Sequence, residues 1–145
     1  QESGLRSGTE PTAQIAALAA ACLSWDAAWP RQIGSLKEHA LEALRAVPGL
    51  KVISAGDAPH ICAVSLPGYP SEMLVRELSD RDICVSAGSA CHRGKPSHVF
   101  AALGLDKRTL TGVLRLSFSP ANTASDVDAL CTALTEITRT RTAMR

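Results

Sequence analysis

The sequence predicts one α/β domain of the α+β kind, in which a small mixed β-sheet is covered by helices. Three observations support this fold class. The 145 residues match the length of one ordinary domain. Apolar residues make up 46% of the chain and charged residues 20%, which is enough for a buried core. The apolar residues recur with helical spacing in some segments and form short runs bounded by turn residues in others.

The first third of the chain predicts a polar loop followed by two helices whose apolar faces are buried. The first helix follows the spacing of one helix face, with apolar residues at Ile15, Leu18, Ala19, Cys22 and Leu23. Pro30 interrupts this pattern, because proline suits the first turn of a helix and not its interior. The second helix carries an apolar stripe and ends at Pro48 and Gly49. That stripe consists of Leu36, Ala40, Leu44 and Val47.

The middle of the chain predicts strands over residues 51–54 and 61–66, joined by a turn over 55–59. Ser71 is expected to cap a helix that runs to about Arg81. A short strand over 83–86 follows, and then a loop rich in glycine and serine over residues 87–95.

The last third predicts a short helix that begins near Pro96 and ends at Gly104, a strand over 113–118 and a final helix over 125–140. The final helix buries an apolar face made of Val127, Leu130, Cys131, Leu134 and Ile137. The expected order of elements is therefore ααββαβαβα.

Charge and composition exclude several classes of function. The net charge is +1 and aromatic residues make up 3%, which argues against binding of nucleic acid. The longest apolar run covers residues 15–23, far short of the roughly 20 residues needed to cross a bilayer. The five cysteines include no CxxC pair, so neither a metal site nor a disulfide framework is expected. Free thiols favour a reducing, cytoplasmic compartment.

One cysteine differs from the others in its surroundings. Cys22, Cys62, Cys84 and Cys131 lie in apolar helix faces or strand runs, where free cysteine behaves as a small core residue. Cys91 lies in the loop Ser86-Ala87-Gly88-Ser89-Ala90-Cys91-His92-Arg93-Gly94-Lys95, which has no bulky apolar residue to bury it. Positive charge nearby favours the thiolate, which is the nucleophilic form. Cys91 is therefore either a reactive thiol or an ordinary loop residue.

Two further positions allow a functional or a structural interpretation. Thr9 and the basic Arg6 precede the first helix, so this segment either binds an anion or simply caps the helix. Arg115 interrupts an apolar strand. It either points to solvent, which its local sequence favours, or lines a pocket and binds a carboxylate through its two-pronged guanidinium.

Four segments in this order resemble the C-terminal part of cysteine desulfurases, enzymes of the class V aminotransferase group that use pyridoxal phosphate (PLP). The segments are Arg6-Ser7-Gly8-Thr9-Glu10, Ser86-Ala87-Gly88-Ser89-Ala90-Cys91, Pro96-Ser97-His98-Val99 and Leu114-Arg115-Leu116-Ser117. The resemblance covers nearly the whole chain. It implies that residues 1–145 form the C-terminal small domain of a fold-type I PLP enzyme, together with the connecting helix.

The resemblance also implies roles for individual residues. The residue matching Cys91 takes sulfur from L-cysteine bound to PLP, becomes a persulfide and passes the sulfur to an acceptor, while L-alanine leaves. The residue matching Arg115 holds the substrate carboxylate. The segment matching Gly8 and Thr9 binds the PLP phosphate of a neighbouring subunit, which implies a homodimer.

The resemblance places the lysine that attaches PLP on a large domain upstream of this segment, and none of Lys37, Lys51, Lys95 and Lys107 matches its context. The loop from Cys91 to Pro96 is shorter than expected, and the chain stops soon after the last helix, where some members continue into a tail that docks an iron–sulfur scaffold. Two alternatives stay open. One is a class V aminotransferase or lyase acting on another amino acid, and the other is a sulfur-carrier or interaction domain without PLP.

Overall fold

The computed structural model describes residues 2–5, 8–54, 56–88 and 98–143. Its centre is one four-stranded sheet in the order β1-β2-β4-β3. The strands are β1 (Lys51–Ser54), β2 (Ile61–Ser65), β3 (Ser86–Ala87) and β4 (Val113–Ser117). The α/β fold class predicted from the sequence is confirmed.

Each pair of neighbouring strands is antiparallel, whereas the sequence predicted a mixed sheet. After the connection through α3 (Ser71–Ser79), β3 runs parallel to β2. Direct pairing of these two strands would have made the sheet mixed. However, β4 lies between β2 and β3 and runs opposite to both. Strands β2 and β3 are therefore not adjacent, and all three ladders between the described strands are antiparallel.

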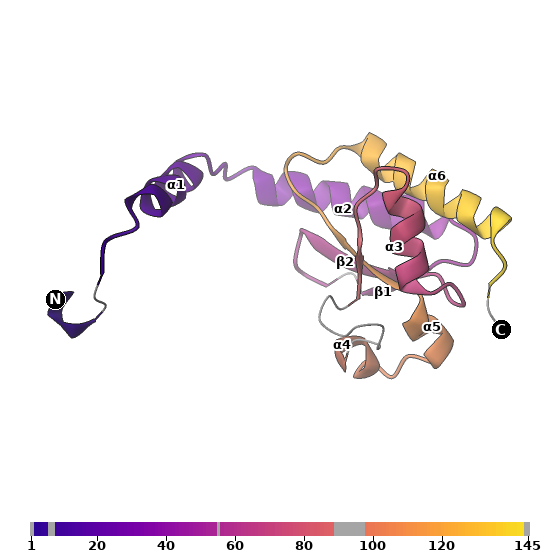
Figure 1. Ribbon diagram of the computed structural model, residues 1–145. Coiled ribbons are helices and arrows are strands. Elements are labelled where there is room, and N and C mark those ends of the chain that lie inside the picture. Colours follow the sequence, from indigo (N-terminus) through magenta and orange to yellow (C-terminus); the bar gives the residue numbers. More distant parts are fainter. Residues whose placement is uncertain (1, 6–7, 55, 89–97, 144–145) are drawn as a thin grey trace.

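Three helices cover one face of the sheet (Figure 1): α2 (Trp29–Arg45), α3 and α6 (Ala124–Thr140). Their apolar stripes and the same face of β2 and β4 form the main core, as the 3.6-residue spacing predicted. Its fully buried side chains include Leu44, Leu74, Leu78, Leu114, Leu134 and Ile137. Thr123 and Asp126 form a capping box that starts α6 one residue earlier than expected.

The other face of the sheet is only partly covered. Two short helices lie there, α4 (His98–Ala101) and α5 (Lys107–Thr111). A small second cluster consists of buried Ala63, Phe100 and Val113, with Ile53, Leu105 and Leu110 packed around it. The sequence predicted one helix between Pro96 and Gly104, so α5 is an additional element. Asp106 starts it, because its carboxylate accepts hydrogen bonds from the backbone N–H and the hydroxyl of Thr109.

The edge strand β3 differs from its prediction. The sequence indicated a strand over 83–86, but the ladder contains only Ser86 and Ala87. They pair with Arg115 and Leu114 of β4, and β3 is the last strand of the sheet on that side within the described residues. Hydrophobicity locates a strand-like run, but contact with β4 decides which residues join the sheet.

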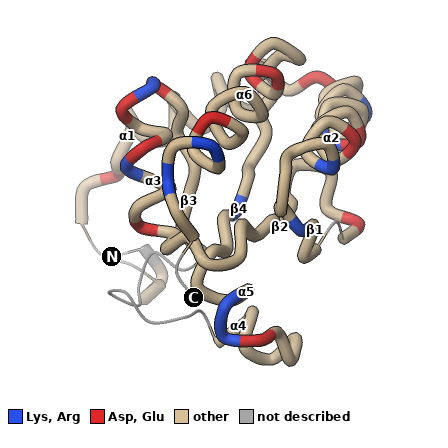
Figure 2. Tube along the Cα trace, turned by 90° about the vertical axis from the view of Figure 1, so that its right-hand side faces the viewer, with Lys and Arg blue, Asp and Glu red and all other residues tan. Residues whose placement is uncertain are grey.

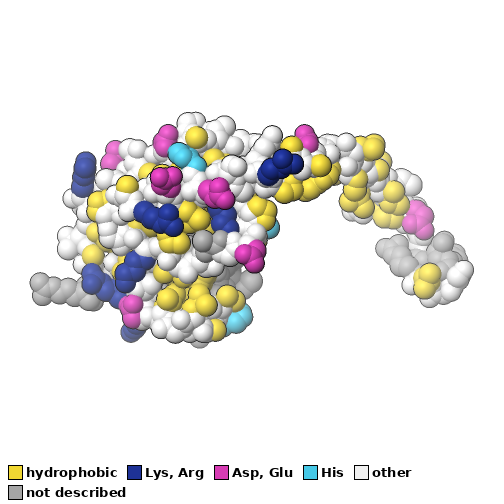
Figure 3. All heavy atoms as spheres, turned by 180° about the vertical axis from the view of Figure 1, so that it is seen from behind, with side chains coloured by type: hydrophobic (Ala, Val, Ile, Leu, Met, Phe, Trp, Pro, Cys, Tyr) yellow, Lys and Arg dark blue, Asp and Glu magenta, His cyan; other side chains and the backbone are white. Residues whose placement is uncertain are grey.

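The N-terminal segment extends away from the sheet (Figure 1) and consists of a 3₁₀ turn, η1 (Glu2–Gly4), and α1 (Thr12–Leu23). The predicted apolar face of α1 exists, but none of its residues is buried. Ile15 and Leu18 are 54% and 66% exposed, and Figure 3 shows apolar side chains along this arm. Periodicity indicates that a helix has an apolar face, but it does not supply the surface that would cover it.

Among the described residues, no helix combines the length and the apolar character needed to cross a membrane.

Candidate active site

Arg115 is the only charged residue in the three strands β2, β4 and β3. Figure 2 shows how basic and acidic residues are distributed along the chain trace. Alternation along β4 places the Arg115 side chain on the partly covered face, the face that Val113 shares with Ala63. The residue is half-buried. Of the two interpretations of Arg115, the structure therefore disfavours simple exposure to solvent.

The guanidinium of Arg115 is incompletely paired within this chain. Its Nη2 donates a long hydrogen bond of 3.4 Å to Ser86 Oγ, directly across the β3–β4 ladder. Its Nε is buried and has no hydrogen-bond partner among the described residues. None of the ion pairs within the described part of the chain involves Arg115. A buried N–H donor of a cationic group is costly to leave without a partner unless a bound anion completes it, so this group is suited to a carboxylate ligand.

Ser86 is the residue at this site that the sequence did not identify. Its role depends on its place opposite Arg115 in the ladder, and only strand register reveals that place.

The segment of Gly8 and Thr9 lies on the N-terminal arm, away from the sheet in Figure 1. Both residues are exposed, and Gly8 has a φ of +123°, which favours glycine. Thr9 does not cap α1, because that helix begins at Thr12 with Pro11 before it. The structure therefore does not bring Gly8 and Thr9 together with Arg115 within one chain.

Cys91 and His92 lie outside the described residues, as do Arg6, Lys95 and Pro96. The two ends of the segment that contains Cys91 are described. Gly88 directly follows β3 at its beginning, and α4 starts at His98 at its end. Both ends therefore lie on or beside the face of the sheet that carries Arg115.

The four described cysteines are free thiols, and the predicted burial is wrong for two of them. Cys22 and Cys84 are exposed and not core residues, because no described element covers α1 and because β3 begins only at Ser86. Cys62 is buried as expected, and Cys131 is half-buried on α6.

Cys62 should be unreactive in the native protein. Burial raises the pKa of its thiol from 9.0 to about 11, against a smaller lowering by the charge of Lys37. At about pH 8, iodoacetamide should therefore alkylate Cys22 and Cys84 but spare Cys62. Between pH 9.0 and about 11, the Cys62 thiol stays protonated in the folded protein but ionises in the unfolded protein. The contribution of the buried thiol to the free energy of unfolding is therefore complete below pH 9.0 and is lost as the pH rises towards about 11. Peptide mapping checks the alkylation, and equal labelling of Cys62 and Cys84 would contradict it.

Lys37 is a buried lysine with a structural role. Its Nζ donates to the backbone carbonyl oxygens of Gly56, at 2.6 Å, and Ala58, at 2.8 Å, and so holds the β1–β2 turn against α2. Its helical spacing with Leu41 and Leu44 is the sequence signal that it faces inward. These two hydrogen bonds hold the Lys37 ammonium group against the turn and leave the residue unsuited to attach a cofactor.

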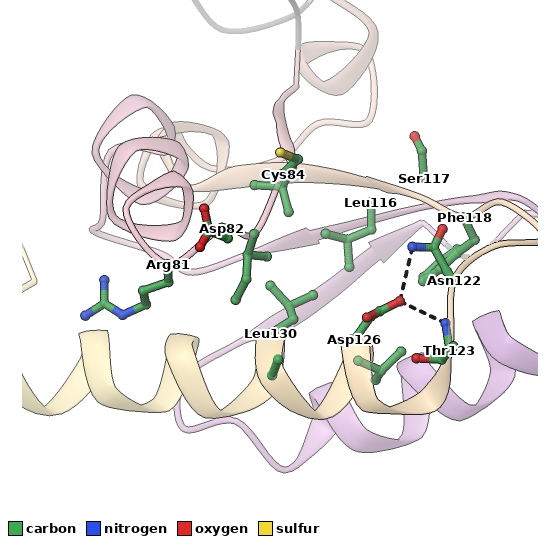
Figure 4. Close-up of a pocket in the computed structure, with 14 residues that line it drawn as sticks. Arg81, Asp82, Cys84, Leu116, Ser117, Phe118, Asn122, Thr123, Asp126 and Leu130 are labelled. Atoms are coloured by element: carbon green, nitrogen blue, oxygen red, sulfur yellow. Dashed lines mark hydrogen bonds between the residues drawn. The ribbon is translucent and has the colours of Figure 1, made fainter.

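A separate cavity of about 380 Å³ lies on the helix-covered side, between the 81–85 segment, the end of β4 and the start of α6 (Figure 4). Leu116, on the opposite face of β4 from Arg115, forms part of its wall. Its carboxylate Asp126 accepts hydrogen bonds from Asn122 and from the backbone of Thr123, and these bonds lower the pKa of Asp126. Because these polar groups satisfy one another, the face that carries Arg115 is the better candidate site.

The antiparallel sheet and the incompletely paired arginine on its open face are compatible with the class of protein that sequence comparison identifies. The chain belongs to the family described as Aminotransferase class-V, whose profile matches residues 1–130.

Within that family the chain is similar to cysteine desulfurases. It is 37% identical to a NifS/IcsS protein homolog of Lactobacillus delbrueckii subsp. bulgaricus, over 94% of this chain and 38% of that protein. It is 32% identical to the cysteine desulfurase IscS of Clostridium botulinum, over 99% of this chain and 39% of that protein. The solved structure of the Escherichia coli cysteine desulfurase CsdA matches with a TM-score of 0.69 and 32% identity, over 91% of this chain and 32% of that one. The chain thus spans less than two fifths of the length of these relatives.

Proposed function

We propose that this chain is the small-domain segment of a PLP-dependent cysteine desulfurase, which converts L-cysteine to L-alanine and carries the sulfur as a persulfide on Cys91. The observation that carries the proposal is the buried, unpartnered Nε of Arg115 on the open face of the sheet, beside the two ends of the segment that contains Cys91. The similarity to named cysteine desulfurases supports the choice of reaction.

Arg115 binds and orients the α-carboxylate of the amino acid, with two parallel N–H···O bonds that a lysine could not make. The Cys91 thiolate attacks the sulfur of the substrate. A sulfur–sulfur bond forms as the carbon–sulfur bond of the substrate breaks. The electron pair of the broken bond stays with the carbon skeleton, which takes up a proton and leaves as L-alanine.

Enzymes of this family in general depend on PLP. When bound, the cofactor supplies an electron sink for bond breaking at the amino acid. The described residues fit its phosphate: Gly8 and Thr9 are exposed, and the Thr9 hydroxyl makes no hydrogen bond within the described part of the chain. A hydroxyl and free backbone N–H groups are suitable donors to a phosphate.

The positions of Gly8 and Thr9 on the N-terminal arm favour a homodimer. Because they lie away from Arg115 of their own chain, they are available to the cofactor site of a second subunit. The attaching lysine is expected on a large domain of the same enzyme, and a sulfur-acceptor protein would receive the persulfide. Free thiols at four described cysteines favour a reducing, cytoplasmic compartment.

The test is turnover of L-cysteine by the complete enzyme that carries this segment. Wild type should release L-alanine and acquire one sulfur atom on Cys91, whereas an aminotransferase would release an oxo acid. Arg115→Ala should raise KM for L-cysteine about a hundredfold, because two charge-assisted hydrogen bonds are lost. Arg115→Lys, which keeps the charge without the fork, should raise it about tenfold.

Arg108→Ala is the matched control, because Arg108 is an exposed arginine of the same domain on α5. It should leave KM unchanged. Equal KM values for wild type and Arg115→Ala would overturn the assignment of Arg115.

A further inference from the structure

A tight contact between Gly88 and Phe100 lies where the chain leaves β3 towards Cys91. Gly88 directly follows β3, and a Cβ atom at Gly88 would lie 2.7 Å from Cε2 and 2.9 Å from Cδ2 of Phe100. The same atom would lie 3.3 Å from Cγ1 of Val113. The ring of Phe100 therefore packs directly on the Gly88 backbone, in a space that only glycine leaves free.

Phe100 is itself fixed to the sheet. Its side chain is 8% exposed and belongs to the cluster formed with Ala63 and Val113. Val113 lies two residues before Arg115 on β4, so both side chains are on the same face. We call the contact of Gly88, Phe100 and Val113 the stem contact. It connects the residues on both sides of the 89–97 segment to β4, the strand that presents Arg115.

The two ends of the segment constrain Cys91 unequally. Cys91 follows Gly88 by three residues, which limits its reach to about 10 Å from the Gly88 Cα atom. It precedes Phe100 by nine residues, which would allow a reach of about 30 Å. The Gly88 end is therefore the one that limits where the thiol can go, and the Phe100 ring packs against it.

We infer that Phe100 is a positioning residue that, through its contact with Gly88, sets where Cys91 meets a substrate held by Arg115. The inference rests on the proposed function. Phe100 makes no bond to the substrate in this role. It acts on the geometry of attack, and a displacement of about 1 Å between reacting groups can lower a rate a hundredfold.

The test uses the complete enzyme and separates geometry from mere reactivity. Phe100→Ala should lower kcat for L-alanine formation by about 10- to 100-fold and leave KM for L-cysteine within twofold, because Arg115 still binds the carboxylate. Alkylation of Cys91 by iodoacetamide should change less than about twofold, since a diffusing reagent does not depend on alignment with a bound substrate. Phe100→Leu, which keeps much of the apolar bulk, should recover most of kcat.

Leu110→Ala is the matched control for packing, because Leu110 is half-buried against the same cluster but contributes none of the three atoms nearest to a Cβ at Gly88. It should leave kcat within about twofold. Gly88→Ala provides a second approach if Phe100→Ala does not fold. The added methyl group should displace the ring and lower kcat, and Gly88→Ala/Phe100→Leu should recover part of it.

Equal effects of Phe100→Ala and Leu110→Ala on kcat would overturn the inference, as would a double variant no better than Gly88→Ala. A rise in Cys91 alkylation that matches the fall in kcat would also overturn it, because the segment would then have come apart. Cys91→Ser distinguishes this failure from that of the proposed function. If it retains turnover, the proposed function is wrong, and if it abolishes turnover, only the positioning role of Phe100 is wrong.

Discussion

Cys91→Ser is expected to lower the rate of L-alanine formation from L-cysteine at least about a thousandfold in the complete enzyme. Serine preserves the size of the side chain, but its hydroxyl is not ionised near neutral pH and cannot take sulfur as a persulfide. Binding of L-cysteine should persist, because Arg115 is unchanged, so the cofactor absorbance should still respond to the substrate. Single-turnover measurement of L-alanine, with intact mass to detect added sulfur, checks the expectation.

Cys84→Ser is the matched control for this prediction. Cys84 is exposed and lies seven residues before Cys91, but it is not in the β3–β4 ladder. Its replacement should leave turnover within twofold. Full turnover by Cys91→Ser would favour an aminotransferase or lyase that acts on another amino acid. A complete polypeptide that binds no PLP would favour the sulfur-carrier or interaction domain.

Gly112→Ala is expected to lower the free energy of unfolding by about 3 kcal/mol or more, a large part of the roughly 5–15 kcal/mol of an ordinary domain. A Cβ atom at Gly112 would overlap the carbonyl oxygen of Leu66, and it would lie 2.7 Å from the carbonyl carbon. It would also lie 3.0 Å from the carbonyl oxygen of Tyr69. These neighbours are backbone atoms, so relief requires the backbone itself to move beside the ends of β2 and β4.

The clash lies at a junction that holds α5 to the end of β2. The Gly112 carbonyl accepts from the Leu66 N–H at 3.1 Å, and buried Ser65 Oγ donates to the Thr109 carbonyl at 2.6 Å. Denaturant unfolding of the 145-residue chain, followed by circular dichroism, measures the loss. Gly34→Ala is the control, because it adds a methyl group in α2 at an ordinary 3.8 Å from Pro59 Cβ and should be neutral or stabilising. Equal stabilities of the two variants would contradict the prediction.

Much of the fold was predictable because its signals are local. The apolar stripes of α2 and α6 repeat every 3.6 residues, and turn residues bound β1, β2 and β4 closely. The helix α5 has only a cap at Asp106 as its signal, without an apolar stripe long enough to reveal it. The edge strand β3 was misplaced because its extent depends on contact with β4, which is distant in the sequence.

The candidate site was predictable in its residue types but not in its assembly. Alternation in β4 indicated that Arg115 points to the side opposite Leu114 and Leu116, but not whether that side is covered. The contact of Arg115 with Ser86 joins residues 29 positions apart, and the neighbouring Phe100 cluster joins Ala63 to Val113, which are 50 positions apart. Likewise, the pattern of α1 indicated an apolar face, yet no described element packs on it.

By itself the sequence determined the fold class, the main helices and strands, the contrast between Cys91 and the other cysteines, and the family. Spacing and turn chemistry act within a few residues, so these features can be read along the chain. Only the tertiary structure decided that the sheet is antiparallel, that Cys22 and Cys84 are exposed, that Arg115 keeps an unpaired buried nitrogen, and that Phe100 packs on Gly88. Each of these features depends on which distant segments contact one another in the folded chain, because burial and strand pairing are set by those tertiary contacts.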